Sequence, residues 1–175
     1  MTGIDPDQRR LGRGMIVLAW LLALGLLTAF FDELLERWEY PNQRLKSSVM
    51  DGVREVVLRQ NVQGHYLAPG TIDDEPVVFL LDTGATTVSV PAALGERLGL
   101  PPGPAEPVTT ANGVITVQRT VIPRLALGPI QLENVRAHLN PRMDSEVVLL
   151  GMSALRDLEL VQRDNTLRLR AYTSP

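Results

Sequence analysis

The residues best suited to do chemistry are Asp82, Thr83 and Gly84, which follow the apolar run Val77–Leu81. That run predicts a buried strand, so Asp82 stands at a strand end where water is scarce. Burial of an isolated carboxyl group raises its pKa. Gly84 allows the backbone to fold back and bring amide N–H groups toward the carboxylate, and the hydroxyls of Thr83 and Thr86 can hold such a loop. An ordinary turn at the end of a strand favours the same residue types.

Composition excludes several other kinds of site. The chain has no Cys, which excludes disulfides, thiolate metal sites and cysteine nucleophiles. Two His residues argue against a multi-histidine metal site. Ser89 and Ser153 lack a nucleophile-elbow sequence, and no glycine-rich phosphate loop follows a strand. We therefore expect neither a metal nor a cofactor. A net charge of −3 also excludes a generally basic nucleic-acid binder.

The elements that must position Asp82 are short strands. Apolar runs separated by turn residues predict a mainly β, barrel-like domain with two short helices, near residues 91–98 and 151–155. Asn112-Gly113 between two such runs is a strong hairpin signal. The expected strands are Val56–Leu58, His65–Ile72, Val77–Leu81, Val108–Thr110, Val114–Val117, Val121–Leu127, Ile130–Leu139, Val147–Leu150, Leu158–Val161 and Leu167–Leu169.

A different pattern precedes this domain. Residues 15–31 contain no charge and many leucines. As a helix they span roughly 25 Å, close to the thickness of the hydrocarbon core of a bilayer. We expect residues 15–35 to form one N-terminal transmembrane α-helix in contact with the lipid bilayer. A buried core helix is the alternative, but so small a domain could hardly enclose a helix that is apolar on every face.

The flanks of this segment predict its orientation. Three arginines precede it and three acidic residues follow it: Arg9, Arg10 and Arg13, then Asp32, Glu33 and Glu36. Positive residues stay on the cytoplasmic side. A cleaved signal peptide is the competing interpretation, but no small-residue cleavage site follows Phe31. We expect an uncleaved signal-anchor of a single-pass inner-membrane protein: residues 1–14 a cytoplasmic tail, 15–35 the anchor, 36–55 a linker, and 56–175 a periplasmic domain.

Several separated motifs point to one family. The run Leu80–Thr86 resembles the active-site signature of the retropepsin-like (clan AA) aspartic proteases, which include the retroviral proteases. The Asn-Gly hairpin has the place of their flap, and Leu149-Leu150-Gly151 resembles their second signature. Finer motifs resemble a bacterial membrane-anchored branch: Gly64-His65-Tyr66, Thr110-Ala111-Asn112-Gly113 and Leu150-Gly151-Met152-Ser153. The resemblance covers roughly residues 60–170.

The resemblance implies a retropepsin-like closed β-barrel, equivalent to half of an acid protease, over residues 56–175. It implies an aspartic endopeptidase with Asp82 as catalytic residue and a polypeptide as substrate. The residues expected to support the active-site loop are Thr83, Gly84, Ala85 and Thr86. Those expected in the flap, against the substrate, are Thr110, Ala111, Asn112, Gly113, Val114 and Ile115.

Such chemistry needs two carboxylates that share one proton on opposite sides of a water. The chain contains a single Asp-Thr-Gly, so we expect a homodimer with Asp82 facing its symmetry mate. In the retroviral relatives terminal strands build the dimer sheet. Leu167–Arg170 alternates in a way that suits this role or that of an ordinary edge strand. The alternative function is a catalytically silent peptide-binding or scaffolding module on the same fold.

Overall fold

The computed structural model describes residues 6–110 and 113–172. The chain divides into two compact units, Met1–Glu39 and Tyr40–Pro175.

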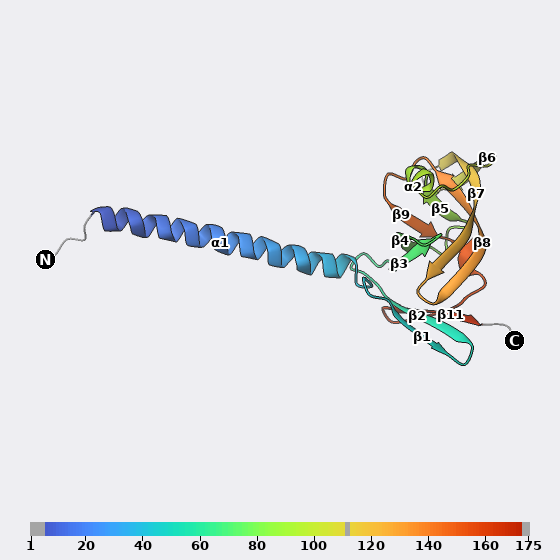
Figure 1. The fold of residues 1–175 in the computed structure, drawn as a ribbon, viewed down its shortest axis with the longest axis horizontal. Coiled ribbons are helices and arrows are strands. Elements are labelled where there is room, and N and C mark those ends of the chain that lie inside the picture. Colours follow the sequence, from blue (N-terminus) through green and yellow to red (C-terminus); the bar gives the residue numbers. More distant parts are fainter. Residues whose placement is uncertain (1–5, 111–112, 173–175) are drawn as a thin grey trace. The chain divides into compact units, whose positions relative to one another are not determined.

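The first unit is the helix α1 (Pro6–Glu39) (Figure 1). The expected helix is confirmed, and it ends shortly before Pro41, which cannot continue the hydrogen-bond pattern. The large apolar side chains that are described between Met15 and Phe31 are exposed. Within the described part of the chain, no helix combines the length and the apolar content needed to cross a membrane. The transmembrane role of residues 15–35 therefore stays a prediction.

The second unit is mainly β, as predicted. Its strands are β1 (Lys46–Met50), β2 (Val53–Arg59), β3 (Leu67–Ile72), β4 (Glu75–Leu81), β5 (Val88–Pro91), β6 (Ala105–Thr110), β7 (Gly113–Leu127), β8 (Ile130–Asn140), β9 (Val147–Leu150), β10 (Glu159–Arg163) and β11 (Thr166–Tyr172). Its helices are short: α2 (Ala92–Arg97) and α3 (Met152–Leu155).

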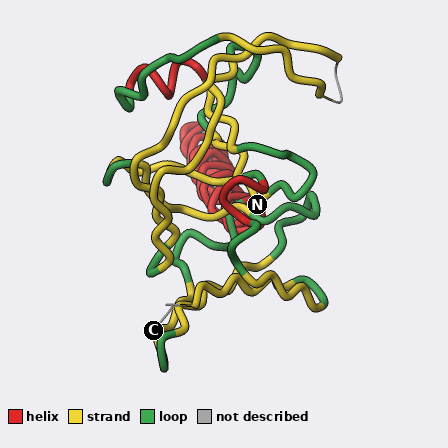
Figure 2. The backbone as a smooth tube through the Cα atoms, turned by 90° about the vertical axis from the view of Figure 1, so that its right-hand side faces the viewer, coloured by secondary structure: helices red, strands yellow, loops and turns green. Residues whose placement is uncertain are grey.

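The strands form two sheets. The smaller one has the order β1-β2-β11-β10, and the larger one has the order β3-β4-β9-β5-β8-β7-β6. The smaller sheet and the hairpin of β6 and β7 lie at opposite ends of the unit (Figures 1 and 2).

The larger sheet returns to its first strand, because β3 also pairs with β7 at Thr71↔Ala126 and Ile72↔Leu125. β5 and β9 are joined at a single position, Ser89↔Leu149. We therefore describe the arrangement as a ring of pairings with two narrow junctions rather than as a closed barrel. The smaller sheet lies outside this ring, which the sequence analysis did not predict.

β4 is the strand that carries the functional loop. Its alternation buries Val77 and Phe79, while Val78 and Leu80 are half-buried on the other face. β4 pairs antiparallel with β3 and parallel with β9. At Gly70 of β3, an added Cβ would lie 2.6 Å from the Phe79 ring, so only glycine lets the ring pack there. These contacts fix the C-terminal end of β4 within the core.

Three elements differ from the sequence-based expectations. β1 lies within residues 36–55, which we expected to be a linker. None of its own residues is buried, and pairing with β2 alone makes it a strand. β5 was missed because a polar residue separates its two valines and its last residue, Pro91, was assigned to the following helix. β7 is one strand rather than two; it passes through Pro123, and the neighbouring Ile122 and Arg124 both pair with β8.

The smaller sheet also corrects the expectation for Leu167–Arg170. These residues belong to β11, which pairs with β2 on one side and β10 on the other. β11 is therefore an internal strand. On its exposed face Arg170 donates to Glu55 (2.6 Å), and this bond, opposed by burial, lowers the pKa of the Glu55 carboxyl below its ordinary value.

Candidate active site

Asp82 is the first residue after β4, at the end of two parallel strands. Its N–H donates to the Leu150 carbonyl (3.1 Å), which continues the pairing of β4 with β9. Asp82 is half-buried. The end of a buried strand pair holds its backbone in place, so the carboxylate position is set by the core.

The following loop orients the carboxylate. Gly84 N–H donates to Asp82 Oδ1 (2.9 Å), and Ala85 N–H donates to the Asp82 carbonyl (3.2 Å). An added Cβ at Gly84 would lie only 3.1 Å from the same Oδ1, so glycine allows this close approach. No hydrogen bond joins Asp82 Oδ2 to any residue the structure describes. One carboxylate oxygen is thus fixed, and the other is available to a water or a second acid.

A second segment holds the loop from the other side. Met152 N–H donates to the Ala85 carbonyl (2.8 Å), and Ser153 N–H donates to the Thr86 carbonyl (3.0 Å). At Gly151, an added Cβ would lie 2.5 Å from the carbonyl oxygen of Thr87 and 2.7 Å from that of Ala85. The backbones can therefore meet only at a glycine. This contact explains why the Leu150–Ser153 motif accompanies the Asp-Thr-Gly motif.

The side chain of Ser153 strengthens the same junction. Its hydroxyl donates to the Arg136 carbonyl (2.7 Å) and accepts from Val88 N–H (2.9 Å). One side chain thus connects α3, β8 and the start of β5. Ser153 was expected to be no nucleophile and to belong to the Leu150–Ser153 motif. Its role as a positioning residue was not predicted, because it depends on contacts between segments far apart in the chain.

A groove of about 510 Å³ opens above Asp82. One side is the active-site loop, with Gly84, Ala85, Thr86 and Thr87. The other sides come from the β6–β7 hairpin and from β5, β8 and β9. Those lining residues are Val108, Thr109, Thr110, Ile115, Val117, Ser89, His138, Asn140 and Leu149. Asp82 is the acidic residue among the described lining residues, so one chain supplies one carboxylate to this groove.

Only some of the predicted flap and loop residues that the structure describes line the groove. β6 and β7 form the expected hairpin, with Thr110↔Gly113 as its last pair. Thr110 Oγ1 donates to the Gly113 carbonyl (2.8 Å), and Gly113 has φ +105°, which favours glycine. Ile115 lines the groove, whereas Val114 is 69% exposed and does not line it. Ala111 and Asn112 lie outside the described residues. Of the predicted loop residues, Thr83 is exposed and does not line the groove.

The polar lining residues that were not predicted include Ser89, His138 and Asn140. Asn140 Nδ2 donates to Ser89 Oγ (3.4 Å), and Ser89 Oγ donates to Met143 Sδ (3.3 Å). Ser89 and His138 stand opposite each other in the parallel pair of β5 and β8. Alternation along the two strands would have placed them on one face, but only if β5 and its partner had been known.

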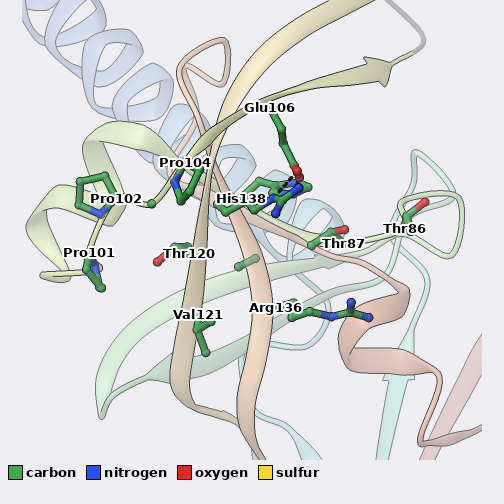
Figure 3. A pocket seen from close by; sticks show the side chains of 13 residues that line it. Thr86, Thr87, Pro101, Pro102, Pro104, Glu106, Thr120, Val121, Arg136 and His138 are labelled. Atoms are coloured by element: carbon green, nitrogen blue, oxygen red, sulfur yellow. Dashed lines mark hydrogen bonds and ion pairs between the residues drawn. The ribbon is translucent and has the colours of Figure 1, made fainter.

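An ion-pair cluster ties the base of the hairpin to the rest of the domain. Glu106 of β6 contacts Arg119 Nε of β7 through Oε2, and its Oε1 lies 2.6 Å from His138 Nε2 of β8 (Figure 3). The hydrogen bond from Arg119 lowers the pKa of the Glu106 carboxyl, and burial opposes this effect. The carboxylate therefore stays charged and joins three strands.

Among residues 6–110 and 113–172, no group of three or more His, Asp or Glu side chains is placed so that it could hold a metal ion.

Comparisons with known proteins agree with this geometry. Residues 68–157 match the family described as "gag-polyprotein putative aspartyl protease". A protein of Sinorhizobium sp. described as "Uncharacterized protein in cobV 5'region" is 30% identical over 183 aligned positions, which cover 97% of this chain and 78% of that protein. The crystal structure of a retropepsin-like aspartic protease from Rickettsia conorii is similar with a TM-score of 0.58 and 22% identity, over 73% of this chain and 96% of that one. The last likeness concerns the fold.

Proposed function

The chain belongs to the family of gag-polyprotein putative aspartyl proteases, which is retropepsin-like, and from this membership we propose that it is an aspartic endopeptidase. The observation that carries the proposal is Asp82 at the floor of a groove. One of its carboxylate oxygens is held by Gly84 N–H, and the other lacks a described partner. A binding module needs no acid in that position.

The proposed chemistry requires two copies of the chain. In a homodimer with a two-fold axis through the groove, each chain brings Asp82 to one shared water. Two carboxyl groups on opposite sides of one water share a proton, and their titration belongs to the pair. The ionised carboxylate takes a proton from the water while the oxygen of the water attacks the scissile carbonyl carbon. The protonated carboxyl donates its proton to the carbonyl oxygen, which gives a tetrahedral intermediate. The C–N bond then breaks as the carboxyl that took the proton from water gives it to the nitrogen, and the carbonyl reforms as its proton returns to the other carboxylate.

The substrate class follows from the lining of the groove. Polypeptides bind such sites in extended form, with backbone hydrogen bonds and alternate side chains in pockets. Val108, Ile115, Val117 and Leu149 present apolar surface beside Asp82. We therefore expect apolar residues on both sides of the cleaved bond. The β6–β7 hairpin would fold over the peptide and exclude water.

The direct test replaces the carboxylate. The full-length Asp82→Asn variant keeps an acceptor for Gly84 N–H but removes the acid, so we expect cleavage of a denatured protein to fall by about 10²–10⁴-fold or more. Asp164→Asn is the matched control, because Asp164 has φ +52° in a turn where asparagine is also tolerated. Equal cleavage by wild type and Asp82→Asn would exclude the mechanism. No cleavage by either, with peptide binding retained, would favour the silent peptide-binding module.

We further propose that residues 15–35 anchor the chain in the inner membrane, with its N-terminus in the cytoplasm and residues 56–175 in the periplasm. The uncharged run at 15–31 and the arginines before it support this proposal. The exposed apolar side chains of α1 also need a non-aqueous surrounding.

Anchoring has a consequence for the dimer. Two chains confined to one membrane have a raised effective concentration. We expect the fragment of residues 40–175 to dimerise more weakly than the full-length chain reconstituted in vesicles, as measured by energy transfer between labelled copies. Equal dimerisation of both forms at matched concentration would contradict this role of the anchor.

A further inference from the structure

A second cavity adjoins the groove of Asp82. It has a volume of about 670 Å³ and shares Thr86, Thr87 and His138 with the groove. The β7–β8 pair and the loop that precedes β6 form its remaining walls (Figure 3). A group bound there would therefore be continuous with a ligand in the groove.

One part of this cavity is apolar. Pro101, Pro102 and Pro104 lie together along one side, and Val121 belongs to β7, which forms another wall (Figure 3). These side chains offer carbon surface and no hydrogen-bond donor. They suit the methylene groups of a ligand side chain rather than its polar end.

The charged residues of the cavity leave one cation unpaired. Glu106 is occupied on both oxygens, by Arg119 and by His138. Arg136 makes its structural contact through its backbone carbonyl, which accepts from Ser153 Oγ (2.7 Å). No hydrogen bond or ion pair joins its guanidinium group to any other residue in the described part of the chain. In Figure 3 that group extends toward the side of the cavity where Thr86 lies.

The charge balance is therefore positive. The charges of Glu106 and Arg119 cancel, and Arg136 adds one positive charge. Thr120 lines the same cavity; it is 7% exposed, and no described residue satisfies its hydroxyl. A buried polar atom without a partner is uncommon. It favours a ligand that carries acceptor oxygens.

We propose that this second cavity binds an acidic side chain of the polypeptide ligand, and that Arg136 is the residue that determines this specificity. The inference rests on the proposed function for the class of ligand. The carboxylate of this side chain, a glutamate for example, pairs with Arg136, while the prolines on the other side of the cavity contact a neighbouring apolar part of the peptide. Because side chains of an extended peptide alternate, the preferred position lies at least two residues from the scissile bond, beyond the apolar residues beside Asp82.

Binding tests this inference without requiring cleavage. The full-length Asp82→Asn protein is titrated with fluorescent peptides that have an apolar centre and carry either Glu or Gln at one position, moved along the peptide. We expect about fivefold tighter binding of the Glu peptide at one such distal position, the size of an exposed ion pair. Adding Arg136→Gln abolishes the difference. Adding Arg124→Gln instead, at an arginine paired with Asp74 on the surface, preserves it.

A charge-reversal variant of Arg136 distinguishes a direct ion pair with the peptide from an indirect structural effect. With Arg136→Glu, the preferred peptide should become the one with Lys at the same position. Equal affinities for Glu and Gln at every position would overturn the proposal. The proposal would also be overturned if Arg136→Gln weakened the binding of the Glu peptide and of the Gln peptide by the same factor, because an equal loss indicates a structural role. A Glu preference in a wild-type chain that cleaves nothing would support this inference while overturning the endopeptidase.

Discussion

Asp82 depends on a glycine far along the chain. Gly151 allows the carbonyls of Ala85 and Thr87 to approach within a distance that no Cβ tolerates, and the Met152 and Ser153 amides then bind the loop. The neighbouring atoms are backbone, which cannot move without moving the catalytic loop. Gly151 is therefore as necessary for the carboxylate position as Gly84.

We expect Gly151→Ala to destabilise the domain by about 1–3 kcal/mol, the usual cost of overpacking, and to reduce cleavage more than stability alone explains. Thermal unfolding followed by circular dichroism and kcat/KM for one peptide are the measurements. Gly25→Ala is the control, because no atom lies within 4 Å of the added Cβ there. Full activity and wild-type stability in Gly151→Ala would refute the role of this contact.

The sequence predicted the role of a single residue only where the motif that indicates the role is local. The Asp82–Thr86 run could be predicted because an acid after an apolar strand and before glycine has a direct physical meaning. Ser153, Ser89 and His138 could not, because their roles arise from pairings between distant strands. No pattern near these residues reports those pairings.

The β6–β7 hairpin is the element that covers the groove, and Glu106 is its tie to β8. Because pairing with Arg119, and secondarily with His138, lowers the pKa of Glu106, the tie contributes fully above the ordinary glutamate pKa of 4.5. It is lost as the pH falls below 4.5 through the lowered pKa of the folded state. The base of the hairpin therefore loosens in acid.

We expect amide protection factors in β6 and β7 to fall between neutral pH and the region below 4.5, relative to those in β4. In Glu106→Gln they should be lower at neutral pH and vary less with pH, because the ion pairs are absent. Hydrogen exchange with mass spectrometry measures both. Glu133→Gln, at an exposed residue of β8, is the control. If the protection of β6 in the wild type did not change with pH, the proposed role of Glu106 in holding the hairpin to β8 would be wrong.

Elements were predicted best where periodicity and burial agree. β4 and β9 were found because each contains a run of apolar residues that enters the core, and β8 was found because its apolar residues alternate with polar ones. β1 was missed because all its residues are exposed, so pairing with β2 alone determines its conformation. β7 was divided at residues 118–120, where Gln118, Arg119 and Thr120 interrupt the apolar pattern, although all three pair with β8.

At the scale of the whole molecule, the proposed activity belongs to an assembly of two chains. The described groove of one chain contains one carboxylate, and β11 is already paired on both sides within its own sheet. Dimerisation through this sheet would therefore use its outer strands, β1 and β10. The proposed anchor would bring two chains together by confining them to one membrane.

The central claim is that one active site contains Asp82 from two chains. Wild-type and Asp82→Asn full-length chains are mixed under exchanging conditions at constant total concentration, reconstituted, and assayed for cleavage of one peptide. If only wild-type pairs are active, the rate follows the square of the wild-type fraction, so an equal mixture retains about a quarter of the activity. A rate that falls in direct proportion to the wild-type fraction, with about half retained, would show that each chain acts alone.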